Sequence, residues 1–152
     1  MPAANLTTLC FSPPSKSFRR VTTMSQQLPI RVLIVEDNTT FRETLQLLFE
    51  LRPEIKVVSS VATGDEAPSA CQEHEPDVVL MDYRMPGMNG AEATRAVLAA
   101  CPSTSVVCLT ASVTQSEIDA LAKAGVVRCL TKDEGFDEIV DAVRTAAGRP
   151  VA

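Results

Sequence analysis

The chain has 152 residues, of which 45% are hydrophobic and 22% are charged, so it can form one globular domain with a full-sized core. No apolar run approaches the roughly 18–20 residues that a membrane span requires, and the net charge of −5 argues against nucleic-acid binding by this chain. Its 5 cysteines are scattered without a Cys-x-x-Cys spacing, which argues against a zinc site or a disulfide framework and favours a cytoplasmic protein.

The first 28 residues differ in composition from the rest. They contain Lys16, Arg19 and Arg20 but no acidic residue, which leaves the remainder of the chain strongly acidic. They are also rich in serine, threonine and proline and show no sustained hydrophobic period. We therefore predict a disordered N-terminal extension over residues 1–28, within which Met24 is an alternative start, and one folded domain over residues 29–149.

Two hydrophobic periods alternate from residue 30 onward. Short apolar runs rich in β-branched residues predict five strands, the second of them more polar and therefore nearer an edge, at 30–35, 55–62, 77–82, 104–110 and 126–132. Apolar residues at helical spacing predict five helices, within 38–53, 64–76, 91–101, 114–125 and 136–147. This alternation predicts an α/β fold, a doubly wound five-stranded parallel sheet with strand order 2-1-3-4-5 and helices on both faces.

Polar residues and one glycine mark where some of these helices begin and end. Thr114 and Glu117 have the spacing of a capping box, and so do Thr40 and Glu43. Gly125 is placed to end the helix that begins near Thr114.

Reactive side chains stand at the carboxyl ends of four of the five predicted strands. The first strand ends in Glu36 and Asp37, the third in Asp82, the fourth in Thr110 and the fifth in Lys132. In a doubly wound sheet, ligands bind at the carboxyl ends of the strands where the winding reverses. We therefore expect three carboxylates, one hydroxyl and one ammonium group to converge on one edge of the sheet.

Three neighbouring carboxylates repel one another unless a counter-charge lies between them. A hard divalent cation such as Mg²⁺ suits this position, because it prefers oxygen ligands and often uses one or two carboxylates together with phosphate oxygens. Such an ion would bridge Asp82 to an incoming phosphoryl group, and a carboxylate nucleophile can form an aspartyl phosphate. Lys132 and Thr110 would then contact the phosphoryl oxygens.

Four motifs in order resemble the receiver domain of two-component response regulators. They are VLIVEDN, VVLMDYRMPGMNG, VVCLTAS and CLTKD, and the resemblance covers roughly residues 29–149. It implies a flavodoxin-like fold, and the first motif and the LTKD ending are similar to the NarL/FixJ-type branch of the family.

The resemblance also implies a role for each site residue. Asp82 would be the phosphoacceptor, Thr110 the switch hydroxyl and Lys132 the phosphoryl-binding lysine. Mg²⁺ would be held by four residues: Asp37, Asp82, Glu36 through a water molecule, and Arg84 through its backbone carbonyl. Where receivers usually carry tyrosine or phenylalanine, three residues before the lysine, this chain has Cys129, so the switch mechanism stays open.

The partners follow from the same resemblance. The phosphoryl donor would be a phosphohistidine on a sensor histidine kinase or on a histidine phosphotransfer protein. Phosphorylation would change the affinity for a downstream protein target, or for a second copy in a homodimer, without any nucleic-acid or membrane partner of this chain alone. Such a protein is a signalling phosphoacceptor rather than an enzyme, since it catalyses only its own phosphorylation and dephosphorylation.

The chain ends 20 residues after Lys132, where relatives in this branch usually continue into a helix-turn-helix DNA-binding domain. We therefore expect a stand-alone receiver. Two alternatives stay open: a receiver fragment of a larger transcriptional regulator, and a phosphorylation-independent interaction domain. A haloacid-dehalogenase-type phosphatase is disfavoured, because it would need a second acid where Arg84 stands, and a flavin-binding module would not place Glu36 and Asp37 after the first strand.

Overall fold

Five parallel strands form one sheet within residues 28–149, the part of the chain that the computed structural model describes. The strands are β2 (Ile30–Val35), β3 (Ile55–Val61), β4 (Val78–Met81), β5 (Ser105–Thr110) and β6 (Arg128–Thr131). Their order is β3-β2-β4-β5-β6, which confirms the predicted order 2-1-3-4-5 and the edge position of the second predicted strand. The predicted disordered extension over residues 1–28 lies, apart from Leu28, outside the described residues.

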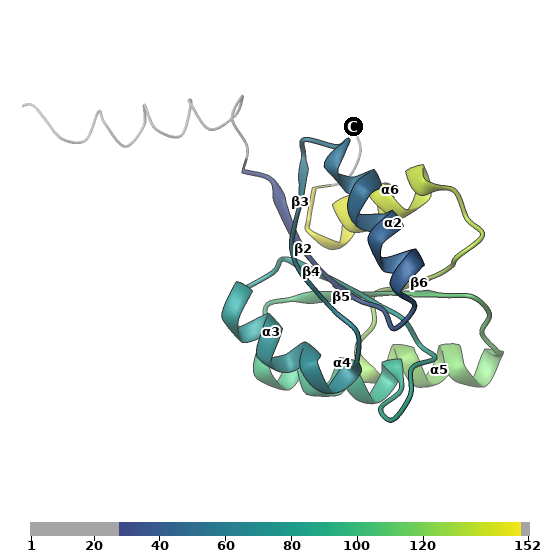
Figure 1. Ribbon diagram of the computed structural model, residues 1–152. Coiled ribbons are helices and arrows are strands. Elements are labelled where there is room, and N and C mark those ends of the chain that lie inside the picture. Colours follow the sequence, from purple (N-terminus) through teal and green to yellow (C-terminus); the bar gives the residue numbers. More distant parts are fainter. Residues whose placement is uncertain (1–27, 150–152) are drawn as a thin grey trace, which may run out of the picture.

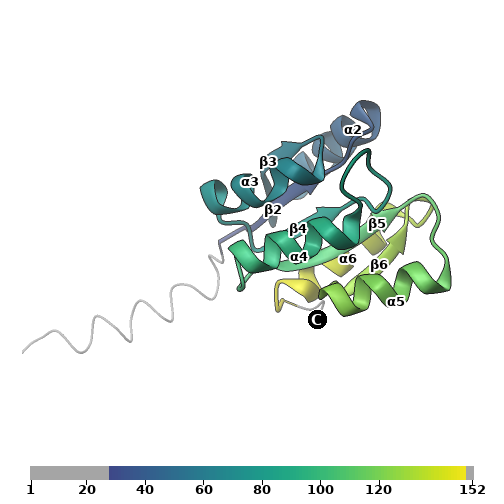
Figure 2. The same cartoon turned by 90° about the horizontal axis from the view of Figure 1, so that it is seen from below.

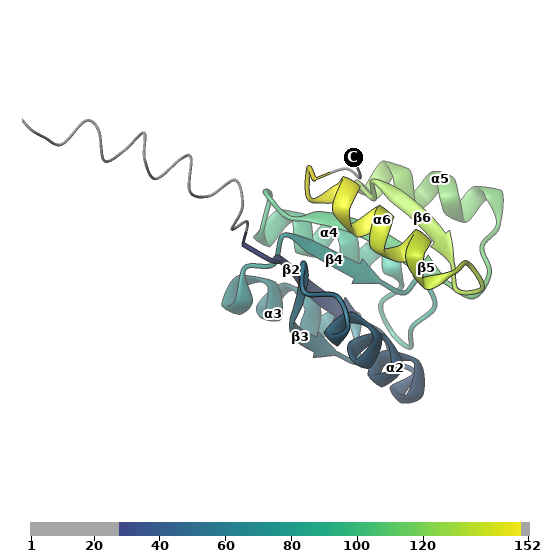
Figure 3. The ribbon, with the colours of Figure 1, turned by 90° about the horizontal axis from the view of Figure 1, so that it is seen from above.

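Helices connect the strands and cover both faces of the sheet. They are α2 (Thr39–Glu50), the short 3₁₀ helix η2 (Gly64–Glu66) followed by α3 (Ala67–His74), α4 (Gly90–Ala100), α5 (Gln115–Ala124) and α6 (Phe136–Ala146). Helices α2 and α6 lie on one face of the sheet (Figures 1 and 3), and α3, α4 and α5 lie on the opposite face (Figure 2). Within residues 28–149, no helix is long and apolar enough to cross a membrane.

The hydrophobic core is divided between the two faces by the alternation of side chains along the strands. In β2, Val32 and Ile34 belong to the cluster that contains residues of α2 and α6, whereas Leu33 and Val35 belong to the cluster that contains residues of α3 and α4. All four are at most 1% exposed. Because successive side chains of a strand point to opposite faces, a strand covered on both sides must be apolar throughout.

The cap of helix α2 lies two residues before the predicted Thr40, so the proposed Thr40–Glu43 capping box is wrong. The cap is Asn38, whose side chain accepts a hydrogen bond from the backbone amide of Phe41 at 2.8 Å. The amide of Asn38 in turn donates to a carboxylate oxygen of Glu36 at 3.0 Å. The helix therefore starts directly beside the acidic end of β2, which brings its first turn close to the site.

The capping box of α5 is confirmed, and so is the end of this helix at Gly125. Thr114 and Glu117 exchange hydrogen bonds with each other's backbone amides. Gly125 has φ 111°, a left-handed conformation that favours glycine, and the amides of Gly125 and Val126 both donate to the carbonyl of Leu121. The residues after Gly125 thus complete a turn, which explains why β6 begins at 128 rather than at the predicted 126.

Candidate functional site

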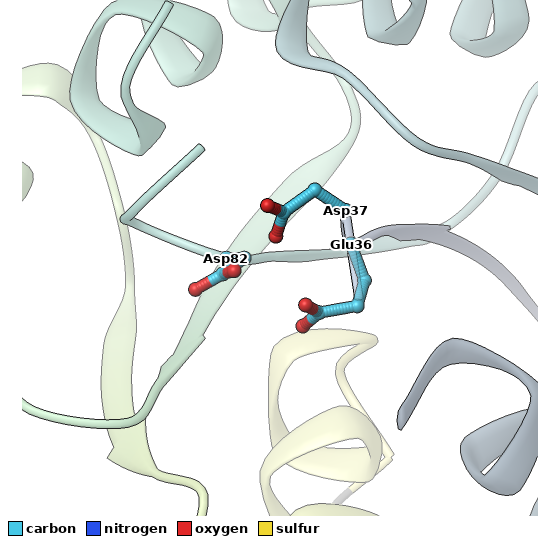
Figure 4. A group of neighbouring side chains, drawn as sticks. All are labelled: Glu36, Asp37 and Asp82. Carbon is cyan, nitrogen blue, oxygen red and sulfur yellow. The ribbon is translucent and has the colours of Figure 1, made fainter. Parts of the chain in front are cut away.

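Three acidic side chains meet where β2 and β4 end. These two strands are neighbours, and their last residues, Val35 and Met81, are paired in the sheet. One carboxylate oxygen from each of Glu36, Asp37 and Asp82 lies within 4.8 Å of the others (Figure 4). The predicted convergence of three carboxylates on one edge of the sheet is therefore found in the structure.

Backbone contacts fix the position of these acids. The amide of Glu36 donates to the carbonyl of Val61 and the amide of Asp82 to the carbonyl of Val35, both at 3.0 Å, so the ladder continues one residue beyond each strand. The start of α4 then packs directly on the strand end: the amide of Gly90 donates to the carbonyl of Tyr83 at 2.8 Å. A Cβ atom at Gly90 would lie 2.6 Å from the carbonyl oxygen of Asp82, so this approach requires glycine.

Lys132 is the cation that faces the acids. Its Nζ atom lies 2.8 Å from a carboxylate oxygen of Glu36 and 3.6 Å from one of Asp82. The same Nζ atom lies 4.5 Å from the ring centroid of Phe41, in cation–π range. Glu36 and Asp82 are 2% and 5% exposed, whereas Asp37 is exposed. One lysine thus pairs with the two buried carboxylates of the cluster, Glu36 and Asp82.

The surroundings of Asp82 disfavour its charged form. Burial raises the pKa of Asp82, the neighbouring Glu36 carboxylate raises it further, and Lys132 only partly offsets them, so that the pKa lies at about 7. A buried carboxylate that resists ionisation is the expected consequence of placing three acids together with one counter-charge. A cation among them would remove this cost, and three hard oxygen donors in reach of one another are the ligands that Mg²⁺ prefers.

The remaining predicted residues surround this cluster at the same edge. Thr110 ends β5 and is fully buried, and its hydroxyl donates to the carbonyl of Ser112 at 3.3 Å. Lys132 follows β6, where its amide donates to the carbonyl of Thr110 at 2.8 Å. The amide of Arg84 lies 3.4 Å from a carboxylate oxygen of Asp82.

Three residues near the site were missed by sequence reasoning. Asn38 caps α2, and its backbone amide donates to Glu36. The sequence did offer a signal for this cap, because asparagine is a preferred cap residue and Asn38 stands between the predicted strand and the helix. Phe41 packs against the core with one part of its ring, and Lys132 lies over that ring in cation–π range. Glu117 pairs with Arg84 across 33 residues of sequence, and no local pattern could reveal that contact.

A pocket opens beside Lys132. It has a volume of about 420 Å³ and is formed by the first turns of α2 together with the lysine; its lining consists of Asn38, Thr40, Phe41, Thr44 and Lys132. Lys132, which pairs with Glu36 and Asp82, thus also borders a shallow surface hollow at the start of α2.

The cysteines of the described part are free thiols: Cys71, Cys101, Cys108 and Cys129. Cys108 and Cys129 are paired on neighbouring strands. Burial raises the pKa of both thiols, which keeps them protonated and poorly reactive. Cys129 packs against the core cluster that contains Cys108.

Comparison with known proteins adds an independent line of evidence. Residues 32–144 match the family model described as response regulator receiver domain. The chain is 39% identical over 116 residues to the transcriptional regulatory protein LnrK of Bacillus subtilis (strain 168), covering 76% of this chain and 53% of LnrK. The chain spans about half the length of the curated relatives that it matches.

Solved structures agree with this match. A two-component response regulator of the LuxR family from Aurantimonas sp. SI85-9A1 is 30% identical with a TM-score of 0.75, covering 82% of this chain and 89% of that one. The response regulator domain of CheB from Thermotoga maritima is 28% identical with a TM-score of 0.72, covering 79% and 97%. With three acids and a lysine at the carboxyl edge of a 2-1-3-4-5 sheet, this chain belongs to the response regulator receiver domain family.

Proposed function

We propose that this chain is a phosphoacceptor of a two-component pathway, and that Asp82 receives the phosphoryl group. The observation that carries the proposal is the position of Asp82: it directly follows the central strand β4, is 5% exposed, and lies beside two further acids and within 3.6 Å of a lysine. Burial and the neighbouring Glu36 carboxylate also raise the pKa of Asp82 to about 7, so its charged form is disfavoured until a cation is present.

The acidic cluster would hold Mg²⁺ through Asp37, Asp82 and the carbonyl of Arg84, with Glu36 acting through water. When bound, the ion would supply positive charge that neutralises a phosphoryl group beside Asp82. The close approach of the three carboxylates supports this assignment, because the described residues give them a single lysine as counter-charge.

The chain's own residues would carry the transfer. A carboxylate oxygen of Asp82 attacks the phosphorus of a phosphohistidine; the new P–O bond forms as the P–N bond breaks, and the imidazole leaves and takes up a proton. Lys132 then exchanges Glu36 for a phosphoryl oxygen. The hydroxyl of Thr110, which donates to Ser112 in the unmodified protein, turns to another phosphoryl oxygen. Both changes follow from the same cause, the arrival of a strong anion.

The donor would be a sensor histidine kinase or a histidine phosphotransfer protein, docking near the pocket beside Lys132. The output would be a changed affinity for a downstream protein or for a second copy of the chain. We assign the chain to the NarL/FixJ-type branch, which its similarity to LnrK and to a LuxR-family regulator supports. The proposal applies equally to a stand-alone receiver and to the receiver segment of a longer regulator.

Incubation with acetyl phosphate tests the proposal. The wild-type chain should gain the mass of one phosphoryl group in the presence of Mg²⁺ and none in the presence of EDTA. Asp82→Asn should gain none under either condition, while Asp77→Asn, a matched change at the other end of β4, should behave as wild type. A wild-type chain that stays unmodified with Mg²⁺ would contradict the proposal and favour a phosphorylation-independent interaction domain.

A further inference from the structure

Arg84 is in contact both with the acidic cluster and with helix α5. Its backbone amide lies 3.4 Å from a carboxylate oxygen of Asp82. Its guanidinium group donates to the Glu117 carboxylate at 2.9 Å, although the two residues are 33 positions apart in the sequence. One residue thus connects the loop that follows β4 to the first turn of the helix that follows β5.

One carboxylate oxygen of Glu117 accepts hydrogen bonds from two different residues. The oxygen that pairs with Arg84 also accepts the backbone amide of Thr114 at 2.9 Å and so closes the capping box of α5. The cap requires an acceptor oxygen but no charge, because glutamine closes a capping box as glutamate does. The Arg84 pair, in contrast, depends on the charge. The side chain of Glu117 is 19% exposed and that of Arg84 is 50% exposed.

The start of α5 is also connected to Thr110. Only residues 111–113 separate Thr110 from the Thr114 cap, and the Thr110 hydroxyl donates to the carbonyl of Ser112 within this segment. Any restraint on the first turn of α5 therefore also restrains the loop in which Thr110 is held.

A phosphoryl group on Asp82 would offer Arg84 a second and stronger anion. It carries more negative charge than a carboxylate and has three acceptor oxygens, for which the planar fork of a guanidinium group is well suited. Arg84 is two residues from Asp82 and its side chain is half exposed, so it is free to change partners. Binding the phosphoryl group would require it to leave Glu117.

We propose that Arg84 is a positioning residue that exchanges partners, binding Glu117 while Asp82 is unmodified and the phosphoryl group once Asp82 is phosphorylated. The exchange releases the first turn of α5 and the loop that contains Thr110. This inference rests on the proposed function and identifies a route by which the state of Asp82 reaches the surface of the protein.

If Arg84 exchanges partners, substitutions of Glu117 and of Arg84 should change the affinity for the phosphoryl group in opposite directions. Glu117→Gln keeps the capping oxygen but removes the charge, so Arg84 is available to the anion and phosphoryl binding tightens. Arg84→Gln removes the donor, so phosphoryl binding weakens. Each effect should be roughly two- to five-fold, the size expected of one solvent-accessible ion pair. In the double variant, Glu117→Gln should have no further effect, because there is no arginine left to release.

Beryllofluoride, a phosphoryl mimic, provides the measurement when it is titrated into the full chain with saturating Mg²⁺. The chain contains 1 tyrosine and no tryptophan, so its intrinsic fluorescence reports on Tyr83, next to Asp82. The matched control is Glu92→Gln: Glu92 closes the capping box of α4 in the same way, and no arginine or lysine pairs with it among the described residues. Its affinity should equal that of wild type.

The exchange is supported if the dissociation constant falls in Glu117→Gln, rises in Arg84→Gln, and is the same in Arg84→Gln and the double variant. An unchanged or weakened affinity in Glu117→Gln overturns it, and so do additive effects in the double variant. Failure of the proposed function looks different, because the wild-type chain itself would then not bind beryllofluoride. Melting temperatures of all variants separate a loss of folding from a loss of exchange.

Discussion

The two ends of the sheet use the same kinds of charged residue in different proportions. At the amino end, Glu54 is paired with both Arg52 and Arg144, and Asp77 accepts the backbone amide of Arg31. At the carboxyl end, three acids lie together, and Lys132 pairs with two of them, Glu36 and Asp82. The surroundings shift acid pKa values in opposite directions: the pKa of Glu54 is lowered, whereas that of Asp82 is raised to about 7.

This difference separates charges that hold the fold together from charges that are kept for a ligand. A paired acid is satisfied by the protein itself and stabilises the folded state. Crowded, buried acids that share too little positive charge are only partly compensated by the protein, and they cost stability until a cation binds. The surplus of negative charge at the carboxyl end is therefore the physical mark of the site.

The largest expected effect comes from disturbing the backbone that positions the carboxyl end. A Cβ atom in Gly90→Ala would meet the carbonyl oxygen of Asp82 at 2.6 Å and the Cα of Tyr83 at 2.8 Å. Backbone atoms cannot move aside as a flexible side chain can, so we expect a loss of about 3 kcal/mol in unfolding free energy. Urea denaturation measures it, and a stability equal to wild type would show that α4 does not depend on this close contact.

Removing the buried charge should have the opposite effect on stability. In the presence of EDTA at pH 8, Asp82→Asn should raise the unfolding free energy by about 2 kcal/mol. The reason is that a neutral amide avoids the cost of burying a negative charge beside Glu36. Added Mg²⁺ should stabilise wild type but not the variant. An Asp82→Asn chain that is less stable than wild type in EDTA would contradict the idea that this carboxylate is reserved for a ligand.

The same neutralisation at the amino end should destabilise the protein. Glu54→Gln weakens the pairs with Arg52 and Arg144, and we expect a loss of about 0.5–1 kcal/mol after allowance for solvent screening. Glu50→Gln, on the exposed side of α2, is the control and should change stability little. If Glu54→Gln stabilised the fold as Asp82→Asn is expected to, the contrast between the two ends would be wrong.

The change in unfolding free energy caused by each of these two variants should also depend on pH. This dependence is a smaller effect than the changes themselves, but it sharpens the contrast between the two ends of the sheet. Burial tends to raise the pKa of Glu54, but hydrogen bonds from its own backbone amide, Arg144 and Arg52 lower it overall. The contribution of the Glu54 carboxylate to the stability of the fold is therefore complete above its ordinary pKa of 4.5 and is lost as the pH falls below that value. The penalty of Glu54→Gln should shrink accordingly on acidification.

For Asp82 the sign is reversed. Its folded pKa lies above its ordinary value of 3.8, so the folded state binds more protons and wild-type stability in EDTA falls as the pH rises from about 4 to about 7. The increase in unfolding free energy caused by Asp82→Asn should therefore become larger as the pH rises over this range, and it should level off above about pH 7. Denaturation at several pH values measures both trends, and a gain that does not vary with pH would contradict the assigned shift.

The sequence was sufficient to predict the elements, their order and the edge at which the acids meet, because hydrophobic period and the geometry of parallel sheets determine these features. It was not sufficient where neighbouring groups compete. Asn38 and Thr40 are both residue types that can cap α2, and in the folded chain the cap is Asn38, whose side chain accepts the amide of Phe41. The Arg84–Glu117 pair depends on how two loops face each other, which no local pattern contains.

A magnesium titration followed by Tyr83 fluorescence tests the central claim most directly, namely that the crowded acids form a cation site. We predict a saturable change in wild type and in Glu54→Gln, and its loss in both Asp37→Asn and Asp82→Asn. Wild-type fluorescence and melting temperature that do not respond to Mg²⁺, or an equal response in Asp82→Asn, would contradict the account.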